Sequence, residues 1–231
     1  MARLAFEGRL YRHLMGLPPD PWWKLLAAAL TEHGYLPRWI RRRLGLATPL
    51  DTADRRVLEN IIIPGYVADP TVKTVLFVGC DNYTVHYKRR YFSQHEYWTL
   101  EPNEKLRRYG VRRRHIMAPL EKLADHFAGE YFDLIICNGV YGWGLNTGGQ
   151  CEAAFAQCHA CLRPGGHLLL GWNDIPTTQA SIALSDVASL RQFDRHRFSA
   201  LGTSHYLTDT PYRHVYAFYR RPDTADSSCL A

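Results

Sequence analysis

Short apolar runs alternate with helix-length segments from about residue 72 onward, and this alternation constrains the fold more than any other feature of the sequence. Each run is short, nearly all apolar and rich in β-branched residues, as expected for parallel strands that helices cover on both faces. The candidate strands are 74–78, 97–100, 115–117, 134–137 and 167–170. The pattern predicts successive βαβ units and a mostly parallel sheet.

The last part of the chain continues this pattern less regularly. A helix is expected over 178–193, a strand near 198–201 and a clearer strand over 213–220. Residues 72–221 are therefore expected to form the main domain, followed by a flexible tail over 222–231. No internal repeat interrupts this organisation.

Residues 1–71 have a different, helical texture and are expected to form an N-terminal extension or lid. One helix should begin after Asp20 and Pro21, and a second should span 38–44. A third should be capped by Asp51 or Thr52 and run to about residue 60, before Pro64 and Gly65 break it.

Composition indicates an ordinary packed protein with a modest positive charge. Hydrophobic residues make up 46% and charged residues 22%, which argues against disorder, and the net charge of +6 raises the expectation of an anionic partner without selecting one. The apolar stretch 25–30 is too short to cross a bilayer, and the N-terminus lacks the apolar block of a secretory signal. With six cysteines expected to stay reduced, these features predict a cytoplasmic protein.

The strongest local signal is a strand that ends in a glycine turn, Val75 to Tyr83, with Gly79 at the turn. In a doubly wound sheet this turn lies at the carboxyl end of a strand, where a nucleotide-like ligand binds. Glu101 follows 22 residues later, at the end of the next candidate strand, where a carboxylate can accept hydrogen bonds from ribose hydroxyls. Taken separately, Gly79 could be an ordinary turn glycine and Glu101 a solvated carboxylate.

Two further segments bring a known family into view. Phe132-Asp133-Leu134-Ile135-Ile136 and Leu162-Arg163-Pro164-Gly165-Gly166 follow the glycine turn and the acidic strand end in the order and at the spacing of class I S-adenosylmethionine-dependent methyltransferases. Residues 72–221 resemble that family. The resemblance implies a three-layer, Rossmann-like α/β fold with a mostly parallel seven-stranded sheet, an antiparallel last strand and S-adenosyl-L-methionine as the cofactor. Nicotinamide-dependent dehydrogenases fit less well, because their fingerprint needs three glycines and only Gly79 is present.

The resemblance also implies a set of cofactor-binding residues. Asp81 and Tyr83 stand where the family has glycines, so Asp81 is expected to contact the methionyl amino group and Tyr83 to pack over the cofactor. Phe77 replaces the usual acid before the turn, and Met117 or backbone groups would have to hold the adenine. A pocket that binds nothing is the alternative. The expected cofactor-binding residues are Gly79, Cys80, Asp81, Tyr83, Glu101, Pro102, Met117, Ala118 and Asn138.

The acceptor side is expected in the glycine- and aromatic-rich loop 138–146 and at the end of the following strand. Tyr141 and Trp143 can form a flat apolar wall, although this loop could instead pack on the N-terminal helices. A histidine is the first candidate for a general base, with His86 preferred to His205, but a lone histidine is more often structural. The expected substrate-binding residues are His86, Tyr141, Trp143, Trp172, Asn173 and Asp174, with no catalytic residue assigned.

Two other clusters contain residue types that are found in functional sites. Basic residues gather at 38–43, 88–90, 107–108 and 112–114, which suggests RNA binding but is more commonly a solvated surface. Cys151, Cys158, His159 and Cys161 fall on one expected helix, which cannot wrap four ligands around a metal ion. Cys158 is instead expected on a core face with Phe155 and Leu162, so no metal site is expected.

Taken together, the sequence predicts a methyltransferase that acts on a small-molecule acceptor, which could be anionic. Two alternatives stay open: a nucleic-acid methyltransferase that uses the basic clusters, and an inactive cofactor-binding regulatory protein. Asn138 does not begin the Asn-Pro-Pro-Tyr motif of nucleic-acid amino methyltransferases, which argues against the first alternative.

Overall fold

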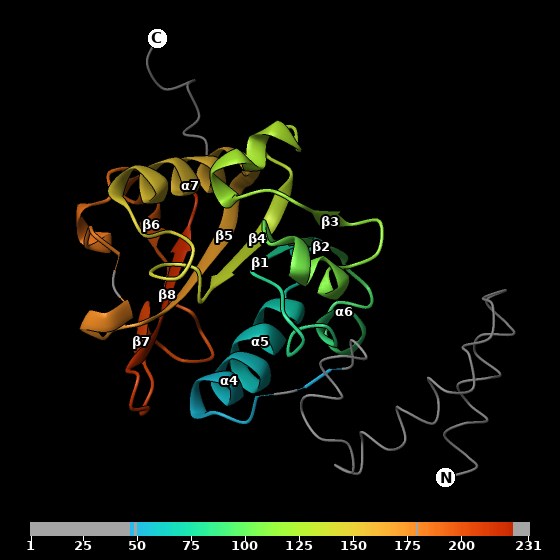
Figure 1. The fold of residues 1–231 in the computed structure, drawn as a ribbon, viewed down its shortest axis with the longest axis horizontal. Coiled ribbons are helices and arrows are strands. Elements are labelled where there is room, and N and C mark those ends of the chain that lie inside the picture. The colour runs from blue at the N-terminus through green and yellow to red at the C-terminus, as the bar shows by residue number, and fades with distance from the viewer. Residues whose placement is uncertain (1–46, 49, 179, 224–231) are drawn as a thin grey trace, which may run out of the picture. The chain divides into compact units, whose positions relative to one another are not determined.

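The computed structural model describes residues 47–48, 50–178 and 180–223, which contain one mixed β-sheet flanked by helices (Figure 1). The strands are β1 Thr74–Val78, β2 Glu96–Leu100, β3 His115–Ile116, β4 Phe132–Asn138, β5 Leu162–Asn173, β6 Asp194–Arg195, β7 His205–Leu207 and β8 His214–Arg220. The sheet and its helices belong to one compact unit that begins at Pro49. The helices expected before residue 46 and most of the expected tail lie outside the described residues.

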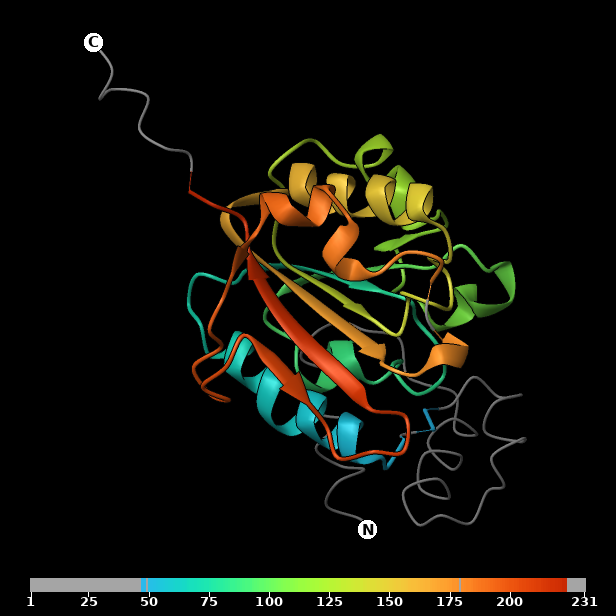
Figure 2. The ribbon, with the colours of Figure 1, turned by 90° about the vertical axis from the view of Figure 1, so that its left-hand side faces the viewer.

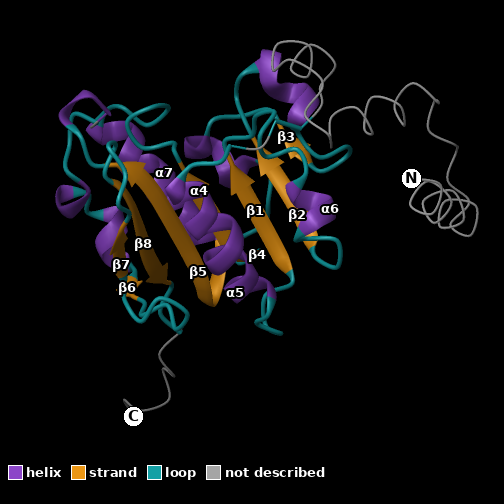
Figure 3. Cartoon of the chain, turned by 90° about the horizontal axis from the view of Figure 1, so that it is seen from below, coloured by secondary structure: helices purple, strands orange, loops and turns teal. Residues whose placement is uncertain are grey.

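The strand order is β3-β2-β1-β4-β5-β8-β6, with β7 also paired to β8 (Figure 3). Strands β1 to β5 run parallel, and β8 lies antiparallel beside β5, with Leu169 opposite Phe218. The predicted Rossmann-like α/β class is confirmed, as are the five parallel strands and the antiparallel last strand. The sheet has eight strands rather than seven because the short β6 and β7 both pair with β8.

Helical layers cover both faces of the sheet, as Figure 2 shows. The helix α4 Ala53–Val57, η1 Leu58–Ile62 and α5 Ile63–Val67 packs on one face together with α6 Tyr87–Arg90. The other face is covered by α7 Gly148–Cys161, η3 Leu120–Asp125 and η6 Ser189–Gln192. Successive β1 side chains alternate between the two cores, Val75 and Phe77 toward α4–α5 and Leu76 and Val78 toward α7, which explains why this strand is apolar throughout.

The buried carboxylate of Asp133, next to Phe132 in β4, fixes the starts of three strands. It accepts hydrogen bonds from the backbone N–H groups of Lys73 and Thr74, at 2.8 and 2.7 Å, and pairs with Arg163 at the start of β5. Because these partners precede or begin β1 and β5, Asp133 aligns both strands with β4. The aspartate of the Phe-Asp-Leu-Ile-Ile segment therefore has a structural role here.

The helix over 53–67 does not break at Pro64, so that prediction was wrong. The chain widens into a π-helical turn at η1, in which the N–H of Ile63 bonds to the carbonyl of Leu58. This turn changes the backbone pairing just before Pro64, which has no N–H to donate. The next residue, Gly65, lies against the ring of Phe198. An added Cβ would lie 2.5 Å from that ring, so this position has no space for a larger side chain. The helix, which lies within the expected extension 1–71, packs directly on the sheet through Leu58 and Ile62.

The described residues of 178–193 also do not form the expected helix. The segment instead forms the short turns η4 Pro176–Thr178 and η5 Leu184–Asp186, and then η6. The carboxylate of Glu152, on α7, accepts hydrogen bonds from the N–H groups of Ala188 and Ser189, at 2.6 and 2.8 Å. Backbone groups that a continuous helix would pair internally are thus paired with α7. The strand expected near 198–201 is reduced to a single bridge between Phe198 and Thr203.

Helix α7 is specified locally at its start and by packing along its length. Thr147 is its N-cap and forms a capping box with Gln150. Phe155 and Cys158 are fully buried in the core with Leu162, as predicted. Within the described ranges, no helix combines the length and apolar character needed to span a membrane.

Candidate functional site

The glycine turn after β1 has the backbone that the sequence predicts. Gly79 has a φ of +82°, and its N–H donates to the carbonyl of Leu100 at the end of β2, at 2.9 Å. A Cβ on Gly79 would lie 3.3 Å from Cγ2 of Val140, which follows β4. The left-handed φ and this close approach both favour glycine, so the turn holds the ends of β1, β2 and β4 together.

Two carboxylates, those of Asp81 and Glu101, follow the ends of β1 and β2 at this edge of the sheet. Oδ1 of Asp81 accepts a hydrogen bond from the N–H of Asn82, at 2.5 Å, and Oε1 of Glu101 accepts one from the N–H of Asn103, at 2.9 Å. Partial burial raises the pKa of Glu101, and the negative charge of Asp81 adds to that rise. Because each carboxylate uses only one of its oxygens in these contacts, oxygen atoms are left to accept hydrogen bonds from a ligand.

Cys80 and Tyr83 complete the turn. Cys80 is buried, and burial raises the pKa of its thiol to about 12, so it stays protonated and is a poor nucleophile. One face of the Tyr83 ring is covered by the guanidinium of Arg55, whose Cζ lies 4.6 Å from the ring centre. Burial raises the pKa of Tyr83, opposed by Arg55 and assisted by Asp81 and Glu101, so the hydroxyl lies in the field of both carboxylates.

The end of β3 offers an apolar and weakly polar surface. His115 Nε2 lies 3.0 Å from Sδ of Met117, which fixes the methionine side chain, and Ala118 is buried. Pro102, after Glu101, is exposed. These residues occupy the carboxyl ends of β2 and β3, next to the turn.

A buried polar chain joins the ends of β4, β5 and β8. His214 Nε2 lies 3.0 Å from Oδ1 of Asn138, and His214 Nδ1 lies 2.7 Å from Oδ1 of Asn173. Burial lowers the pKa of His214 to about 4, so the imidazole is neutral near pH 7 and carries one N–H. That N–H donates to one of the two amide oxygens, and the other ring nitrogen accepts from the second asparagine when its amide is turned to present the NH2 group. These three side chains lie over Gly171, where an added Cβ would collide with Oδ1 of Asn138.

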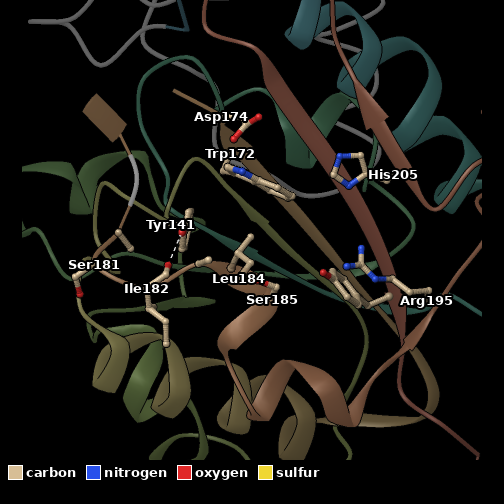
Figure 4. A pocket seen from close by; sticks show the side chains of 12 residues that line it. Tyr141, Trp172, Asp174, Ser181, Ile182, Leu184, Ser185, Arg195 and His205 are labelled. Carbon is tan, nitrogen blue, oxygen red and sulfur yellow. Dashed lines mark hydrogen bonds between the residues drawn. The ribbon is translucent and has the colours of Figure 1, made fainter. Parts of the chain in front are cut away.

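A pocket of about 480 Å³ lies beyond the carboxyl ends of β4 and β5 (Figure 4). Tyr141 and Trp172 form an aromatic corner with ring centres 6.3 Å apart, and the Tyr141 hydroxyl donates to the carbonyl of Ile182, at 2.6 Å. Arg195 and His205 lie on the opposite side from Tyr141. The pocket is lined by Tyr141, Trp172, Asp174, Ala180, Ser181, Ile182, Ala183, Leu184, Ser185, Arg195, His205 and Tyr219.

The polar groups of this pocket carry both signs of charge. Asp174 pairs with Arg213, at 3.4 Å, and Arg195 lies over the ring of Tyr219 with its Cζ 4.8 Å from the ring centre. The His205 ring centre lies 5.9 Å from that of Trp172. Burial and the nearby Arg195 lower the pKa of His205, opposed by Asp174, so its imidazole is neutral at neutral pH.

The residues expected to bind an acceptor do not all lie together in the structure. Tyr141, Trp172 and Asp174 line the pocket, whereas Asn173 belongs to the chain around His214. Trp143 is 65% exposed and does not line the pocket, so Trp172 rather than Trp143 is the aromatic partner of Tyr141.

His86 lies in a third place, against α4–η1. Its Nε2 is 4.0 Å from Oε2 of Glu59, its ring packs on Tyr87 and Tyr91, and burial lowers its pKa. It does not line the pocket.

Arg55, Arg195 and Tyr219 are among the residues of these sites that the sequence did not single out. Arg195 and Tyr219 belong to β6 and β8, which pair with each other, and no local motif marks either. Arg55 belongs to a helix that the sequence assigned to the N-terminal extension. Arg55 lies near the start of this helix, one turn or two before the apolar residues Leu58 and Ile62. This spacing is the one signal in the sequence that the Arg55 side chain is buried.

Comparisons with known proteins agree with this architecture. Residues 76–170 match the family model of a methyltransferase domain. A comparison with curated proteins finds no match.

Among solved structures, the N-methyltransferase NodS from Bradyrhizobium japonicum WM9 in complex with S-adenosyl-l-homocysteine is 16% identical, with a TM-score of 0.56, over 75% of this chain and 90% of that chain. The PH0226 protein from Pyrococcus horikoshii OT3 is 12% identical, with a TM-score of 0.53, over 80% of this chain and 100% of that chain. A SAM-dependent methyltransferase from Methanosarcina mazei is 10% identical, with a TM-score of 0.51, over 70% and 97% of the two chains. At these identities the likeness concerns the fold.

Proposed function

We propose that this chain, a class I S-adenosylmethionine-dependent methyltransferase, transfers a methyl group to a small-molecule acceptor bound beside Tyr141 and Trp172. The family, the activity and the cofactor follow from the methyltransferase-domain match over residues 76–170 together with the fold. The class of acceptor and the roles of individual residues are the proposal.

The residues at the ends of β1, β2 and β3 fit the cofactor. Glu101 has a carboxylate oxygen available for ribose hydroxyls, and Gly79 has the left-handed backbone that lets a ligand approach the turn. Met117 and Ala118 offer an apolar surface for adenine. Asp81 would accept a hydrogen bond from the methionyl amino group, and Asn138 would stand at the end of β4 next to the transferred group.

The loop after β4 links this cofactor site to the pocket. Val140 packs against Gly79, and the next residue, Tyr141, lines the pocket. An acceptor held by Tyr141 and Trp172 would therefore lie next to the cofactor turn. This adjacency is the observation that carries the proposal, and a pocket of about 480 Å³ has the size of a small-molecule site.

The chemistry asks little of the protein beyond alignment, dehydration and removal of a proton. S-adenosylmethionine supplies a methyl group that is already activated by its positively charged sulfur. Tyr141 and Trp172 would orient the acceptor and exclude water from it. The unprotonated nitrogen of the neutral His205 imidazole would accept the proton that a hydroxyl or ammonium acceptor loses.

The basic clusters give less support to a nucleic-acid substrate. The Lys88 ammonium donates to the carbonyls of Phe92 and His95, at 2.7 and 2.8 Å, so it is used inside the fold. Arg107 pairs with Glu104, and Arg108 lies over the ring of Tyr109. The cluster at 38–43 lies outside the described residues.

The proposal can be tested with methyl-labelled S-adenosylmethionine and fractions of a cell extract. Label should appear in the fraction below about 3 kDa. Trp172→Leu should reduce that transfer about 10-fold or more, because it removes an aromatic wall, while S-adenosylhomocysteine still binds. Tyr212→Ala, at an exposed tyrosine outside the pocket, is the matched control and should transfer normally.

Three outcomes would contradict the proposal. Label found only in RNA or protein would identify a macromolecular acceptor, and salt-sensitive RNA binding would support the nucleic-acid alternative. Cofactor binding without transfer to any fraction would favour a regulatory protein. Equal transfer by Trp172→Leu and Tyr212→Ala would remove the pocket from the reaction.

A further inference from the structure

Arg55 on α4 is a buried cation with few partners. Arg55 is only 7% exposed, and the one hydrogen bond of its side chain to another described residue runs from Nη1 to the hydroxyl of Tyr87, at 3.1 Å. Among the residues that the structure describes, no carboxylate lies within 4 Å of its guanidinium. A guanidinium has five N–H donors, so most of them have no acceptor in the described part of the chain.

The neighbouring arginine shows the ordinary arrangement. Arg56 is exposed and its Nε donates to Oδ1 of Asp51, at 2.6 Å. Burying a charge without a counter-ion is costly, whereas leaving it at the surface, as with Arg56, is not. The burial of Arg55 therefore calls for an anion that the described residues do not provide.

The surroundings hold the Arg55 guanidinium in one orientation. Its face lies on the ring of Tyr83, and the Tyr87 hydroxyl that accepts from it donates in turn to Oε1 of Glu59, at 2.8 Å. Glu59 therefore does not bond to Arg55 directly, because the Tyr87 hydroxyl oxygen lies between them. The stacked face and the single anchored N–H leave the rest of the planar fork in place for a ligand.

This position adjoins the proposed cofactor site and strand β8. Tyr83, beneath Arg55, closes the glycine turn and lies in the field of Asp81 and Glu101. The neighbouring residue Asp54 accepts a hydrogen bond at its carbonyl from the Tyr216 hydroxyl of β8, at 2.9 Å, and the charge of Arg55 contributes to the lowered pKa of His214. Arg55 is therefore close both to Tyr83 of the glycine turn and to β8.

We propose that Arg55 is the carboxylate-binding residue of this site, with its guanidinium forming charge-assisted hydrogen bonds to a ligand carboxylate. The inference rests on the proposed site around Gly79 and Glu101. Two ligand groups have this chemistry: the α-carboxylate of the methionyl part of the cofactor, and a carboxylate on the acceptor. Asp81 and Glu101 would repel either group, so Arg55 supplies the positive charge that the turn itself lacks.

The first experiment compares two ligands that differ at the carboxylate. S-adenosylhomocysteine carries the amino-acid group, whereas 5′-methylthioadenosine shares the nucleoside and the thioether sulfur but lacks it. Isothermal calorimetry would measure both ligands on wild type, Arg55→Met and the control Arg56→Met. If the carboxylate is that of the cofactor, Arg55→Met lowers the affinity for S-adenosylhomocysteine about 10- to 100-fold. The affinity for 5′-methylthioadenosine stays within about 2-fold of the wild-type value. Arg56→Met leaves both ligands unchanged.

A second arm tests the acceptor as the source. Wild type saturated with S-adenosylhomocysteine would be titrated with benzoate at constant ionic strength, and the melting temperature followed. A benzoate-dependent rise that Arg55→Met abolishes and Arg56→Met retains assigns the carboxylate to the acceptor. If Arg55→Met does not fold, Arg55→Lys replaces it in both arms, because a lysine keeps the charge but loses the planar pair of donors.

Two results overturn the inference. One is an equal loss of affinity for S-adenosylhomocysteine and 5′-methylthioadenosine, which would make Arg55 a purely structural residue. The other is no effect of the Arg55 variants in either arm. Failure of the wild type to bind S-adenosylhomocysteine would instead refute the cofactor site itself, so the two failures are distinguishable.

Discussion

His214 should make the stability of the fold depend on pH in mildly acidic solution. Its imidazole is buried between Asn138 and Asn173, and burial lowers its pKa from 6.5 to about 4. Above pH 6.5 the histidine is neutral in both the folded and the unfolded chain. Between pH 6.5 and about 4, the unfolded chain binds a proton that the folded chain does not, so the free energy of unfolding falls as the pH falls.

The size of this effect follows from the two pKa values. At about 1.36 kcal/mol per pH unit, the difference between 6.5 and about 4 amounts to about 3 kcal/mol, lost progressively over that window. Burial also lowers the pKa of His167 to about 4, so His167 causes a further loss of unfolding free energy over the same pH range. Together they are a large part of the stability of an ordinary domain.

Urea denaturation at a series of pH values between 7.5 and 4.5 measures this dependence. His214→Gln removes one titrating group, so the slope of unfolding free energy against pH should decrease by up to about 1.4 kcal/mol per pH unit near pH 5. The control His126→Gln, at an exposed histidine, should keep the wild-type slope. The slope, rather than the stability at pH 7, is the readout, because the substitution also breaks the Asn138–Asn173 chain. An identical slope for His214→Gln and wild type would refute the reasoning.

Three further predictions concern the site. Gly171→Ala should destabilise the fold by about 1–3 kcal/mol in urea denaturation, because its Cβ would meet Oδ1 of Asn138, and an unchanged midpoint would contradict this packing. Glu101→Gln should weaken S-adenosylhomocysteine about 10-fold in calorimetry without lowering the melting temperature, and unchanged affinity would exclude the ribose contact. Tyr141→Phe should cost about 1 kcal/mol of stability through its lost bond to the carbonyl of Ile182, and a chemical-denaturation midpoint equal to wild type would show that this bond contributes nothing.

The central parallel strands β1 and β4 were predictable because they are buried on both faces. β1 alternates between two apolar cores, and that double burial leaves a continuous apolar run in the sequence. Gly79 was predictable for a related reason, since a strand end followed by glycine indicates a turn with positive φ. Such signals depend only on neighbours in the chain.

The predictions from the sequence were wrong where residues far apart in the chain form the hydrogen bonds or packing contacts. Residues 178–193 contain enough apolar side chains for a helix, but Glu152 of α7 captures the N–H groups of Ala188 and Ser189. Pro64 and Gly65 usually end a helix, but the π-helical turn before them and the ring of Phe198 beside them let the helix continue. In each case a tertiary contact outweighs a local preference.

The candidate site also combines residues that the sequence predicts with residues that only the tertiary structure brings together. Sequence alone determined the glycine turn, the carboxylate of Glu101 at the next strand end and the run of parallel strands along the chain, and parallel strands place their carboxyl ends at one edge of the sheet. Only the tertiary structure decided that Arg55 reaches Tyr83, and that Arg195 and His205 face Tyr141 across a pocket. These residues are brought together by helix packing and antiparallel pairing between segments far apart in the chain, and the local periodicity of a sequence does not encode such contacts.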